Sequence, residues 1–334
     1  MTKRLDGLLS EICGDGGCPR GKPRFETPAL ATLTDDYFDD PGWIYERKLD
    51  GERVVAVKAD EKVTLYSRNE KKLNGSYPEI VEALEAQDGD FVVDRDVVAF
   101  EGNRSSFARL QGRIGLHDPE RARGTGIAVY YYVFDLLSAG GYALDGLPLT
   151  ERKKLLRAAL SFSNRVRFTP HRREKGIEYR REACAKGWEG VIAKDGSAPY
   201  ARGRSRKWLK FKCVRDQELV IGGFTDPKGS RVGFGALLVG YWDGGKLRYA
   251  GKIGTGYDDE TLRRLRDRLD GIVRDDSPFA DPVRETGAHF VHPRLVAQAG
   301  FTEWTRDNKL RHPRFLGLRR DKAAKDVVRE TPDD

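Results

Sequence analysis

The hydrophobic and polar positions of the first two thirds of the chain alternate between patterns typical of strands and of helices. Residues 43–60 (WIYERKLDGERVVAVKAD) are rich in β-branched and aromatic residues around the turn signal Asp50-Gly51, which predicts a strand, a turn and a second strand. Residues 127–137 (IAVYYYVFDLL) are apolar on both faces, which predicts a central buried strand. Further strands are expected at residues 62–68, 91–100, 190–194 and 207–212.

Two helices are expected between these strands. Pro78 opens a short helix with Ile80 and Leu84 on one face. Thr150 is a plausible N-cap for a second helix that runs to Leu160. The pattern therefore predicts a mixed α/β domain over residues 25–213.

The pattern changes after Asp216. Short apolar strands alternate with Gly-rich turns, and a helix is expected from Asp258, with leucines on one face and Gly271 as its stop signal. Several short strands with one helix are typical of a small β-barrel such as an OB-fold. We expect this second domain over residues 214–325, followed by a C-terminal tail over residues 326–334.

The N-terminal residues 1–24 are rich in glycine and charge, and they predict a flexible lead-in. They contain no apolar segment of the kind that directs secretion, and no stretch of the chain is long and apolar enough to cross a membrane. The four cysteines are too few and too scattered for a disulfide framework, and a zinc site at Cys13 and Cys18 is disfavoured. A reducing cytoplasm is expected.

The positive charge is concentrated in stretches. Lys and Arg number 60 against 52 Asp and Glu, so the net charge is +8. Residues 201–213 (ARGRSRKWLKFKC) hold six basic residues and no acid, and residues 306–325 are also basic. Such stretches attract polyanions, above all nucleic acid, although a solvated charged surface is the alternative.

The segment from Glu46 to Arg53 (ERKLDGER) carries the candidate chemistry. A lysine nucleophile must lose its proton, yet a free lysine has a pKa of about 10.4. Nearby cations such as Arg53 disfavour the charged amine and would help to activate Lys48. Taken alone, the segment is also compatible with an ordinary charged hairpin.

The order of motifs favours the nucleophile. The segment resembles the KxDGxR signature of the covalent nucleotidyltransferases, and the whole series resembles that of bacterial ATP-dependent DNA ligases of the end-joining type. The motifs that carry this resemblance are Lys48 to Arg53, Ser67-Arg68-Asn69, Val93-Asp94-Arg95-Asp96, Val133-Phe134-Asp135, 189–194 (EGVIAK), 208–212 (WLKFK) and a closing block at 301–322.

The resemblance implies an α+β protein, with an ATP-grasp-like adenylation domain of mixed sheets and helices followed by an OB-fold barrel. It implies that Lys48 attacks ATP to form lysyl-AMP, which then passes to a DNA 5′-phosphate. The nucleotide contacts that it implies are Glu46, Arg53, Arg68, Phe134, Glu189, Arg204, Lys210, Lys212, Arg319 and Lys322, with Asp321 in the same closing motif. Phe134 as a core residue and the two lysines as an exposed strand face remain the structural alternatives.

The resemblance also implies a divalent metal, with Asp96 and Glu189 as carboxylate ligands. Here the sequence departs from the usual Asp-Gly-Glu. Arg95 replaces a glycine, so a positive φ at this position would be strained, and Asp96 replaces a longer glutamate. Glu70 likewise stands where a glycine often follows. Mg²⁺ is the expected metal, and a preference for Mn²⁺ is a hypothesis that follows from the shorter side chain of Asp96.

Two other functions stay open at this point. One is an RNA ligase or a GTP-using capping enzyme, and the other is a DNA-binding repair partner with weak catalysis. Under the ligase interpretation, the expected partners are nicked or broken duplex DNA, a Ku-like end-binding protein and a separate polymerase. A monomer acting at the nucleoid is expected.

Overall fold

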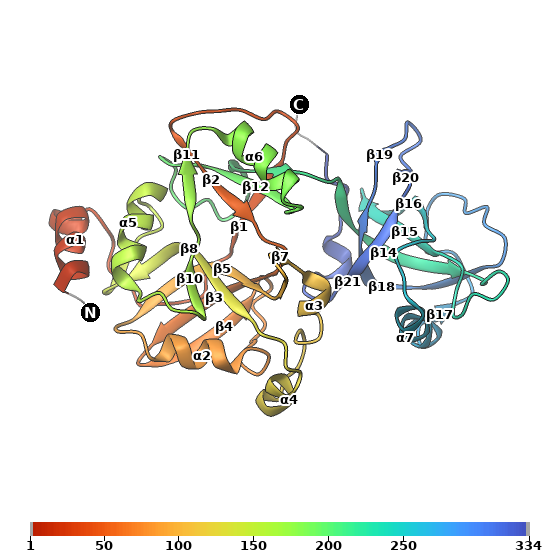
Figure 1. Ribbon diagram of the computed structural model, residues 1–334, viewed down its shortest axis with the longest axis horizontal. Helices are drawn as coiled ribbons and strands as arrows, with labels where there is room; N and C mark the ends of the chain where they lie inside the picture. The colour runs from red at the N-terminus through yellow and green to blue at the C-terminus, as the bar shows by residue number, and fades with distance from the viewer. Residues whose placement is uncertain (1–2, 332–334) are drawn as a thin grey trace. The chain divides into compact units, whose positions relative to one another are not determined.

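The computed structural model describes residues 3–331, which form two compact units (Figure 1). The first unit ends at Cys213, and the second runs from Val214 to Thr331. Each unit is described by itself below. No helix among the described residues is long and apolar enough to cross a membrane.

The first unit contains a five-stranded sheet in which only the β1–β13 pair is parallel. The strand expected at residues 207–212 is present as the second part of β13, which begins at Gly203. The strands, in their spatial order, are β1 (Ala29–Leu33), β13 (Gly203–Lys212), β12 (Gly190–Asp195), β2 (Trp43–Lys48) and β11 (His171–Arg173).

A second sheet of six strands lies in the same unit. Its strand β8 lies between β10 and β5 and is mostly buried, so the prediction of a buried inner strand is confirmed. The spatial order is β10 (Val166–Phe168), β8 (Tyr130–Ala139), β5 (Phe91–Val98), β3 (Glu52–Ala59) and β4 (Lys62–Ser67), and β9 (Tyr142–Ala143) pairs with β8.

The strand, turn and second strand predicted over residues 43–60 are present, but the two strands do not pair with each other. β2 belongs to the five-stranded sheet and β3 to the six-stranded sheet, so the chain crosses between the sheets at residues 49–51. Gly51 permits this crossing, because a Cβ there would lie 2.3 Å from the Val97 carbonyl oxygen of β5. Lys48 consequently lies where the chain leaves one sheet for the other.

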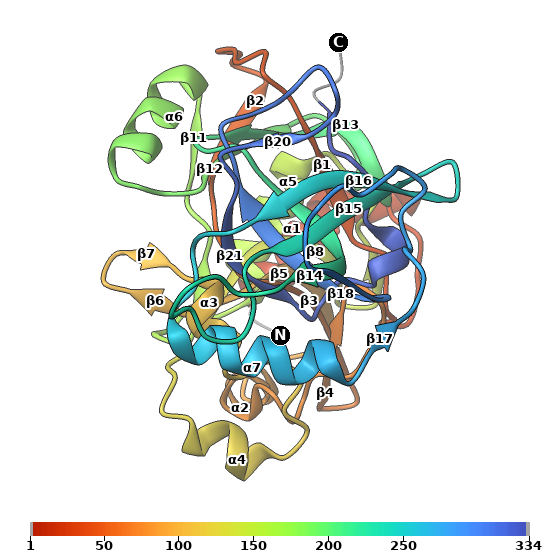
Figure 2. The ribbon, with the colours of Figure 1, turned by 90° about the vertical axis from the view of Figure 1, so that its right-hand side faces the viewer.

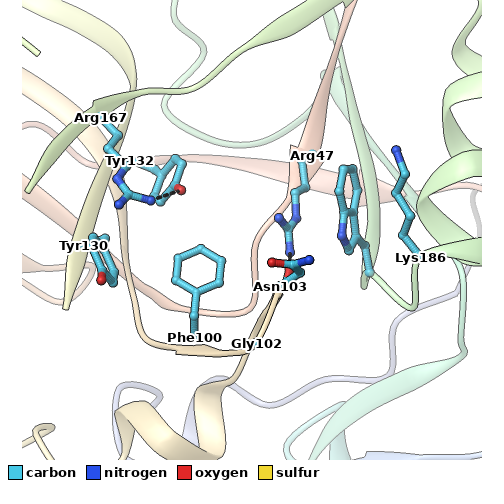
Figure 3. A pocket seen from close by; sticks show the side chains of 9 residues that line it. Arg47, Phe100, Gly102, Asn103, Tyr130, Tyr132, Arg167 and Lys186 are labelled. Carbon is cyan, nitrogen blue, oxygen red and sulfur yellow. Dashed lines mark hydrogen bonds between the residues drawn. The ribbon is translucent and has the colours of Figure 1, made fainter. Parts of the chain in front are cut away.

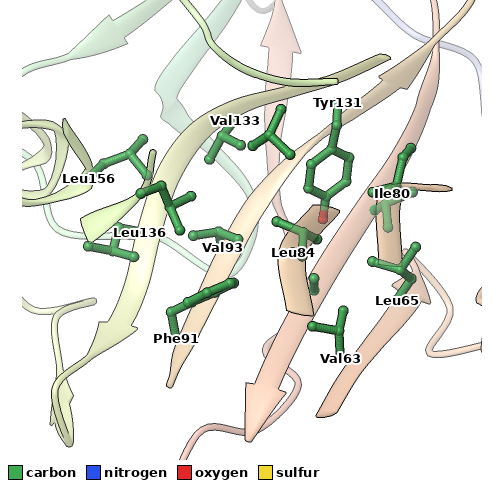
Figure 4. Close-up of a cluster of buried hydrophobic side chains, with 14 of the residues drawn as sticks. Val63, Leu65, Ile80, Leu84, Phe91, Val93, Tyr131, Val133, Leu136 and Leu156 are labelled. Atoms are coloured by element: carbon green, nitrogen blue, oxygen red, sulfur yellow. The ribbon is translucent and has the colours of Figure 1, made fainter. Parts of the chain in front are cut away.

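The six-stranded sheet is covered on both faces. One face packs against α2 (Pro78–Glu85) and α5 (Leu149–Ala159), with Val93 and Tyr131 in the resulting core (Figure 4). The other face contributes Val55 and Phe134 to a cluster with Trp208 of the five-stranded sheet. The two sheets therefore pack face to face, and polar residues between them are enclosed by protein on both sides.

The helix α2 begins at Pro78 as predicted. The helix α5 begins one residue before the expected cap, because Pro148 rather than Thr150 takes the N-cap position. The remaining elements of this unit are β6 (Phe100–Glu101), β7 (Arg104–Ser105), α3 (Phe107–Leu110), α4 (Pro119–Gly124) and α6 (Gly176–Ala185).

The lead-in is not the flexible segment that its composition predicts. Residues Lys3–Cys13 form α1, which lies beside α5, and Gly14–Gly16 form a short 3₁₀ helix, η1 (Figure 1). Leu5 and Leu9 of α1 are buried in the main core. The buried leucines of α1 therefore hold this segment against the core, although glycines follow it in the sequence.

The expectation of unpaired cysteines is also wrong. Cys13 pairs with Cys18, and Cys184 of α6 pairs with Cys213, both as disulfides. The second disulfide joins residues that are 29 positions apart, so it fixes the end of β13 to α6.

The second unit is an antiparallel sheet with one long helix. The helix α7 (Asp259–Asp270) has Asp258 as its N-cap and buries its three leucines, as predicted, and it runs on to β17 (Figure 2). The sheet order is β16 (Lys246–Ile253), β15 (Leu237–Asp243), β14 (Asp216–Thr225), β18 (Ala288–Gly300) and β17 (Val273–Arg274), with β21 (Arg314–Arg319) paired to β18.

The second unit also holds the last described residues. A small hairpin is formed by β19 (Glu303–Trp304) and β20 (Leu310–Arg311), and a 3₁₀ helix, η2, spans Ala324–Asp326. Val327 is fully buried, and its carbonyl oxygen accepts the Trp242 backbone N–H at 2.8 Å. Residues 326–331 are thus docked rather than a free tail, and residues 332–334 lie outside the described chain.

Candidate active site

Strand register places the basic and acidic motif residues on one face of the five-stranded sheet. In the first row, Ile192 pairs with both Glu46 and Lys210. In the next row, Gly190 pairs with both Lys48 and Lys212. Since residues opposite each other in neighbouring strands point to the same face, the nucleophile candidate and both lysines of β13 share one surface.

Gly190 lies between Lys48 and Lys212 for a steric reason. Its φ is +149°, and a Cβ there would lie 2.2 Å from the Phe211 carbonyl oxygen. A larger residue would clash with β13. The glycine also leaves the space between the two lysine side chains free of a third side chain.

Lys48 forms an ion pair with Glu189, the residue immediately before β12. Both side chains are mostly buried, with 18% and 19% of their surface exposed. A carboxylate in contact with the amine favours its charged form. Lys48 is therefore held as an ammonium in this arrangement.

The opposing sheet brings a second set of charges into the same space. Arg53 of β3 pairs with Asp96 of β5. The Arg53 guanidinium binds Asp94 through two hydrogen bonds of 2.5 and 2.6 Å, and Tyr200 donates to the same carboxylate. The charge of Asp94 is thus neutralised by Arg53, and both of its oxygens are occupied by hydrogen bonds. Asp96 is the carboxylate of β5 that could take part in binding or catalysis.

Asp96 lies near Lys48, the candidate nucleophile. Burial raises the pKa of Asp96 to about 6, although the charges of Arg53 and Lys48 oppose this shift. A bound cation would favour the ionised form of this carboxyl group. Among the described residues, no group of three or more acidic, histidine or cysteine side chains forms a complete metal site.

Arg95 does not cause the backbone strain expected from its replacement of a glycine. It is absent from the residues with positive φ and lies within β5. Because neighbouring strand residues point to opposite faces, its side chain enters the helix-covered core, where it is fully buried over the Tyr131 ring at 3.7 Å. Its Nη1 and Nη2 atoms have no hydrogen-bond partner there.

Glu46 is enclosed by two lysines. Lys194 lies 2.7 Å from one carboxylate oxygen, and Lys153 of α5 forms an ion pair with the other. Burial alone would raise the pKa of Glu46, but the two lysines outweigh it and hold that pKa below its usual value. Beside this cluster, burial and Lys153 lower the pKa of His171 to about 4, so its ring is neutral near pH 7.

Comparison with known proteins identifies the family. Residues 28–212 match the family described as ATP dependent DNA ligase domain, and residues 230–322 match the ATP dependent DNA ligase C terminal region. The chain belongs to the ATP-dependent DNA ligases. Its two units are accordingly the adenylation domain and an OB-like β domain.

Several relatives of this ligase carry the end-joining name LigD. The multifunctional non-homologous end joining protein LigD of Pseudomonas aeruginosa is 35% identical over 365 aligned positions, which cover 99% of this chain and 42% of that protein. The DNA ligase of Thermococcus fumicolans is 31% identical over 85% of this chain and 53% of its own length. The chain thus spans less than half of the LigD protein.

A solved structure agrees with this fold. The mycobacterial DNA ligase D complexed with ATP and MES superposes with a TM-score of 0.66 at 32% identity, and the match covers 92% of this chain and all of that one. The two units of the ligase therefore have a close counterpart in a structure that contains ATP.

The Phe134 ring of the ligase is more buried than a ring that is exposed for stacking on a base would be. It is 4% exposed, with the Arg53 guanidinium 4.4 Å and the Lys194 amine 4.0 Å from its ring centre. The ring thus contacts two cations in this state. Its role in stacking on adenine stays a prediction.

The remaining predicted contacts of the first unit lie at strand ends or edges. Arg68 follows β4, and Glu70 two residues later has a φ of 58°, in the left-handed region where a glycine is usual. Arg204 of β13 donates from Nη1 to the Ala31 carbonyl oxygen at 3.1 Å. The structure does not bring either arginine into the rows of Lys48 and Lys210.

The closing-motif residues of the second unit form their own ion-pair cluster. Arg319 binds Asp321 at 2.7 and 2.9 Å, and both Arg319 and Lys322 pair with Glu218 of β14. Burial would raise the pKa of Glu218, but the two cations lower it further than burial raises it. Arg319 and Lys322 are thereby held in one place on β21 and the turn that follows.

Three site residues were missed by the sequence interpretation. Lys153 and Tyr200 contact Glu46 and Asp94, but they lie outside the ordered motifs and carry no local signal. Lys194 stands at the end of the EGVIAK motif, two residues after Ile192, and residues two apart in a strand point to the same face. Because Ile192 pairs with Glu46, this spacing was a signal that could have placed Lys194 near Glu46.

Proposed function

We propose that this ligase seals 5′-phosphate/3′-hydroxyl nicks or ends in DNA through a lysyl-AMP intermediate on Lys48. The observation that supports this proposal is the position of Lys48, which faces Glu189 and shares a surface with the two lysines of β13. Phosphoryl transfer depends mostly on positioning and on charge neutralisation, and this surface offers both.

The first step proceeds as an in-line displacement. The neutral Lys48 amine attacks the α-phosphate of ATP, a P–N bond forms, the bond to the bridging oxygen breaks, and pyrophosphate leaves. The amine must first lose its proton and its contact with Glu189. In the later steps AMP passes to the DNA 5′-phosphate, and the 3′-hydroxyl then displaces AMP.

The nucleotide contacts of this proposal follow from residue chemistry. Lys210 and Lys212 would neutralise the α-phosphate, and forked guanidinium groups suit ribose and phosphate oxygens. The proposed contacts are Glu46, Arg53, Arg68, Phe134, Glu189, Arg204, Lys210, Lys212, Arg319 and Lys322.

The donor set suits a magnesium or manganese ion. Mg²⁺ commonly binds through one or two carboxylates together with substrate phosphates, and Asp96 and Glu189 supply two carboxylates. When bound, the cation would neutralise charge on the phosphate oxygens. Because Asp96 is shorter than glutamate, we propose a preference for Mn²⁺. Equal self-adenylylation with both metals across a titration would contradict that preference.

The finer architecture and the pathway are also part of the proposal. We propose that the second unit is an OB-fold whose strands close into a barrel. The name of the Pseudomonas relative supports a role in non-homologous end joining. A Ku-like end-binding protein and a separate polymerase would then act with this chain at DNA breaks, and the ligase itself would act as a monomer.

The direct test is nick sealing with ATP on DNA/DNA and DNA/RNA duplexes. We expect sealing of the DNA/DNA nick with ATP and not with GTP. Efficient labelling by GTP would indicate a capping-type enzyme, and preferential sealing of RNA would indicate an RNA ligase. DNA binding without any covalent AMP would indicate a binding partner.

A further inference from the structure

The first unit contains a cavity of about 600 Å³ that the proposed steps do not use. Figure 3 shows two groups of aromatic and basic side chains facing each other across it. Cavities of this size hold ligands as large as a nucleotide. The first group comes from β8, β10 and the strand β6, and the second from β2 and the segment after α6.

The first wall of the cavity is an aromatic cluster with one arginine. The Phe100 ring lies 5.6 Å from Tyr130 and 6.0 Å from Tyr132, measured between ring centres. Arg167 lies 4.1 Å above the Tyr130 ring and donates to the Tyr132 hydroxyl at 2.9 Å. This wall therefore presents π-faces and a fixed positive charge side by side.

The second wall repeats this combination. The Arg47 guanidinium lies 4.1 Å and the Lys186 amine 5.0 Å from the Trp188 ring centre. Arg47 donates from Nη2 to the Asn103 carbonyl oxygen, but its buried Nε has no hydrogen-bond partner. The cavity lining holds three cations and no carboxylate, so it is complementary to an anion.

The cavity is distinct from the Lys48 surface. Arg47 stands between Glu46 and Lys48 in β2, so its side chain leaves the strand on the opposite face. Neither Lys48 nor Glu189, Lys210 or Lys212 lines the cavity. An ATP molecule whose α-phosphate reaches Lys48 would therefore have its phosphates on the other side of the strand.

We propose that this cavity binds an unpaired nucleotide of the DNA substrate, which extends the proposed ligase function. The base would stack against the aromatic rings, and its phosphate would bind the arginines. Aromatic platforms with nearby cations are the usual means of holding single-stranded nucleic acid without sequence preference. The two faces of a paired base are covered by its neighbours in the duplex, so only an unpaired base can stack on these rings, and the site selects an overhang or a displaced end.

The test compares duplexes that carry a short single-stranded overhang with blunt duplexes of the same length. The overhang contains 2-aminopurine, whose fluorescence falls when it stacks on an aromatic ring. Phe100→Ala and Arg167→Gln are the test variants. Arg172→Ala is the matched control, because Arg172 also lies over a tyrosine, at 4.2 Å from Tyr179, but outside the cavity.

We expect quenching in the wild-type protein and in Arg172→Ala. The two test variants should bind the overhang roughly 5- to 100-fold more weakly, with less quenching and with unchanged affinity for the blunt duplex. Thermal melting of each variant controls for folding, and two chemically different substitutions guard against a single misfolded variant.

Three outcomes would overturn the proposal. Equal loss of affinity for blunt and overhang duplexes would indicate a general backbone contact. An increased KM for ATP in the self-adenylylation of the two test variants would indicate that the cavity binds ATP. Unchanged binding by both variants would leave the cavity without a role in DNA binding. Self-adenylylation of the wild-type protein is measured in parallel, so failure of the ligase function is seen separately from failure of this site.

Discussion

Lys48 forms an ion pair with Glu189 across the junction of β2 and β12. This contact holds the amine in its protonated form, although the reaction requires the neutral amine. The same carboxylate is also a proposed metal ligand. Glu189 therefore links the protonation of Lys48, the proposed nucleophile, to the occupancy of the proposed metal site.

Replacing Glu189 by glutamine tests this link. Glu189→Gln keeps the shape of the side chain but removes the charge that pairs with Lys48 and that would bind a cation. We expect self-adenylylation to fall by on the order of 100-fold or more, as is typical when one preorganised electrostatic contact is lost. Quench-flow labelling with ATP measures this rate.

The matched control is Glu182→Gln. Glu182 lies on α6 in exposed ion pairs with Arg172 and Lys186, away from the nucleophile. Its removal should leave the rate within a few-fold of wild type, since exposed ion pairs contribute little. Equal rates for Glu189→Gln and wild type would contradict the proposed role of Glu189.

The burial of the Asp96 carboxyl group leads us to expect a conflict between the stability of the protein and its activity. Burial raises the pKa of Asp96 to about 6 from 3.8, so the folded protein binds this proton more tightly than the unfolded chain does. The stability contributed by the protonated carboxyl group is present below about pH 4 and is lost as the pH rises to about 6. Near neutral pH the charged form costs up to about 3 kcal/mol.

Asp96→Asn should therefore stabilise the protein near neutral pH while it lowers metal-dependent adenylylation. Urea denaturation and ATP labelling measure the two effects. Asp195→Asn is the control of opposite sign, because Ser197 and Lys207 lower the pKa of Asp195 despite its partial burial. A destabilised Asp96→Asn variant that keeps full activity would contradict this account.

Arg95 predicts that a single substitution increases stability. Its guanidinium is fully buried, and only Nε has a partner, the Val54 carbonyl oxygen at 3.2 Å. Burial lowers the pKa of Arg95 well below its usual value. Arg95→Met keeps an unbranched side chain and removes the buried charge, so we expect a gain of about 1–4 kcal/mol in the free energy of unfolding.

Arg95→Gly restores the residue that is usual in the family and should have the opposite effect. It leaves a cavity over Tyr131 and weakens a central strand. Arg104→Met in the exposed part of β7 serves as the control and should change stability by less than about 0.5 kcal/mol. A urea midpoint of Arg95→Gly above that of Arg95→Met would contradict the view that the buried charge of Arg95 destabilises the protein.

The disulfide between Cys184 and Cys213 predicts a redox dependence of stability. It closes a loop of 29 positions, which corresponds to roughly 3–4 kcal/mol. Reduction should therefore lower the urea midpoint of the wild-type protein. The variant Cys184→Ser should be less stable under oxidising conditions and should respond less to reductant, whereas Cys13→Ser should retain most of the response. Identical midpoints in oxidised and reduced wild type would contradict the prediction.

Long periodic segments of the fold were predictable from sequence. The helices at Pro78 and Asp258 and the buried strand β8 formed as expected, because the helices have apolar residues at helical spacing and the strand is apolar on both faces. The strands on either side of Asp50-Gly51 also formed, but their partners were not predictable, because a turn signal does not determine which strands pair. The helix α1 was hidden by the glycines that follow it, although Leu5 and Leu9 lie at helical spacing.

The site was predictable only where its residues lie in ordered motifs. Lys48 and the lysines of β13 lie in register on one sheet, and Glu189, immediately before β12, pairs with Lys48, so their motifs led to one surface. Lys153 lies on α5, about a hundred residues after Glu46 in the sequence, and no local sequence pattern indicates such a contact. The Arg95 side chain points into the core because neighbouring strand residues alternate between faces. Comparing this motif with the usual Asp-Gly-Glu does not show that.

The central claim is that the amine of Lys48 becomes covalently bonded to AMP. Mass spectrometry of the purified protein incubated with ATP and Mg²⁺ or Mn²⁺, followed by peptide mapping, tests it most directly. We predict the added mass of one AMP on the peptide that contains Lys48, and its loss in Lys48→Ala. An intact protein mass that never changes with either metal, or an adduct on another residue, would contradict the account.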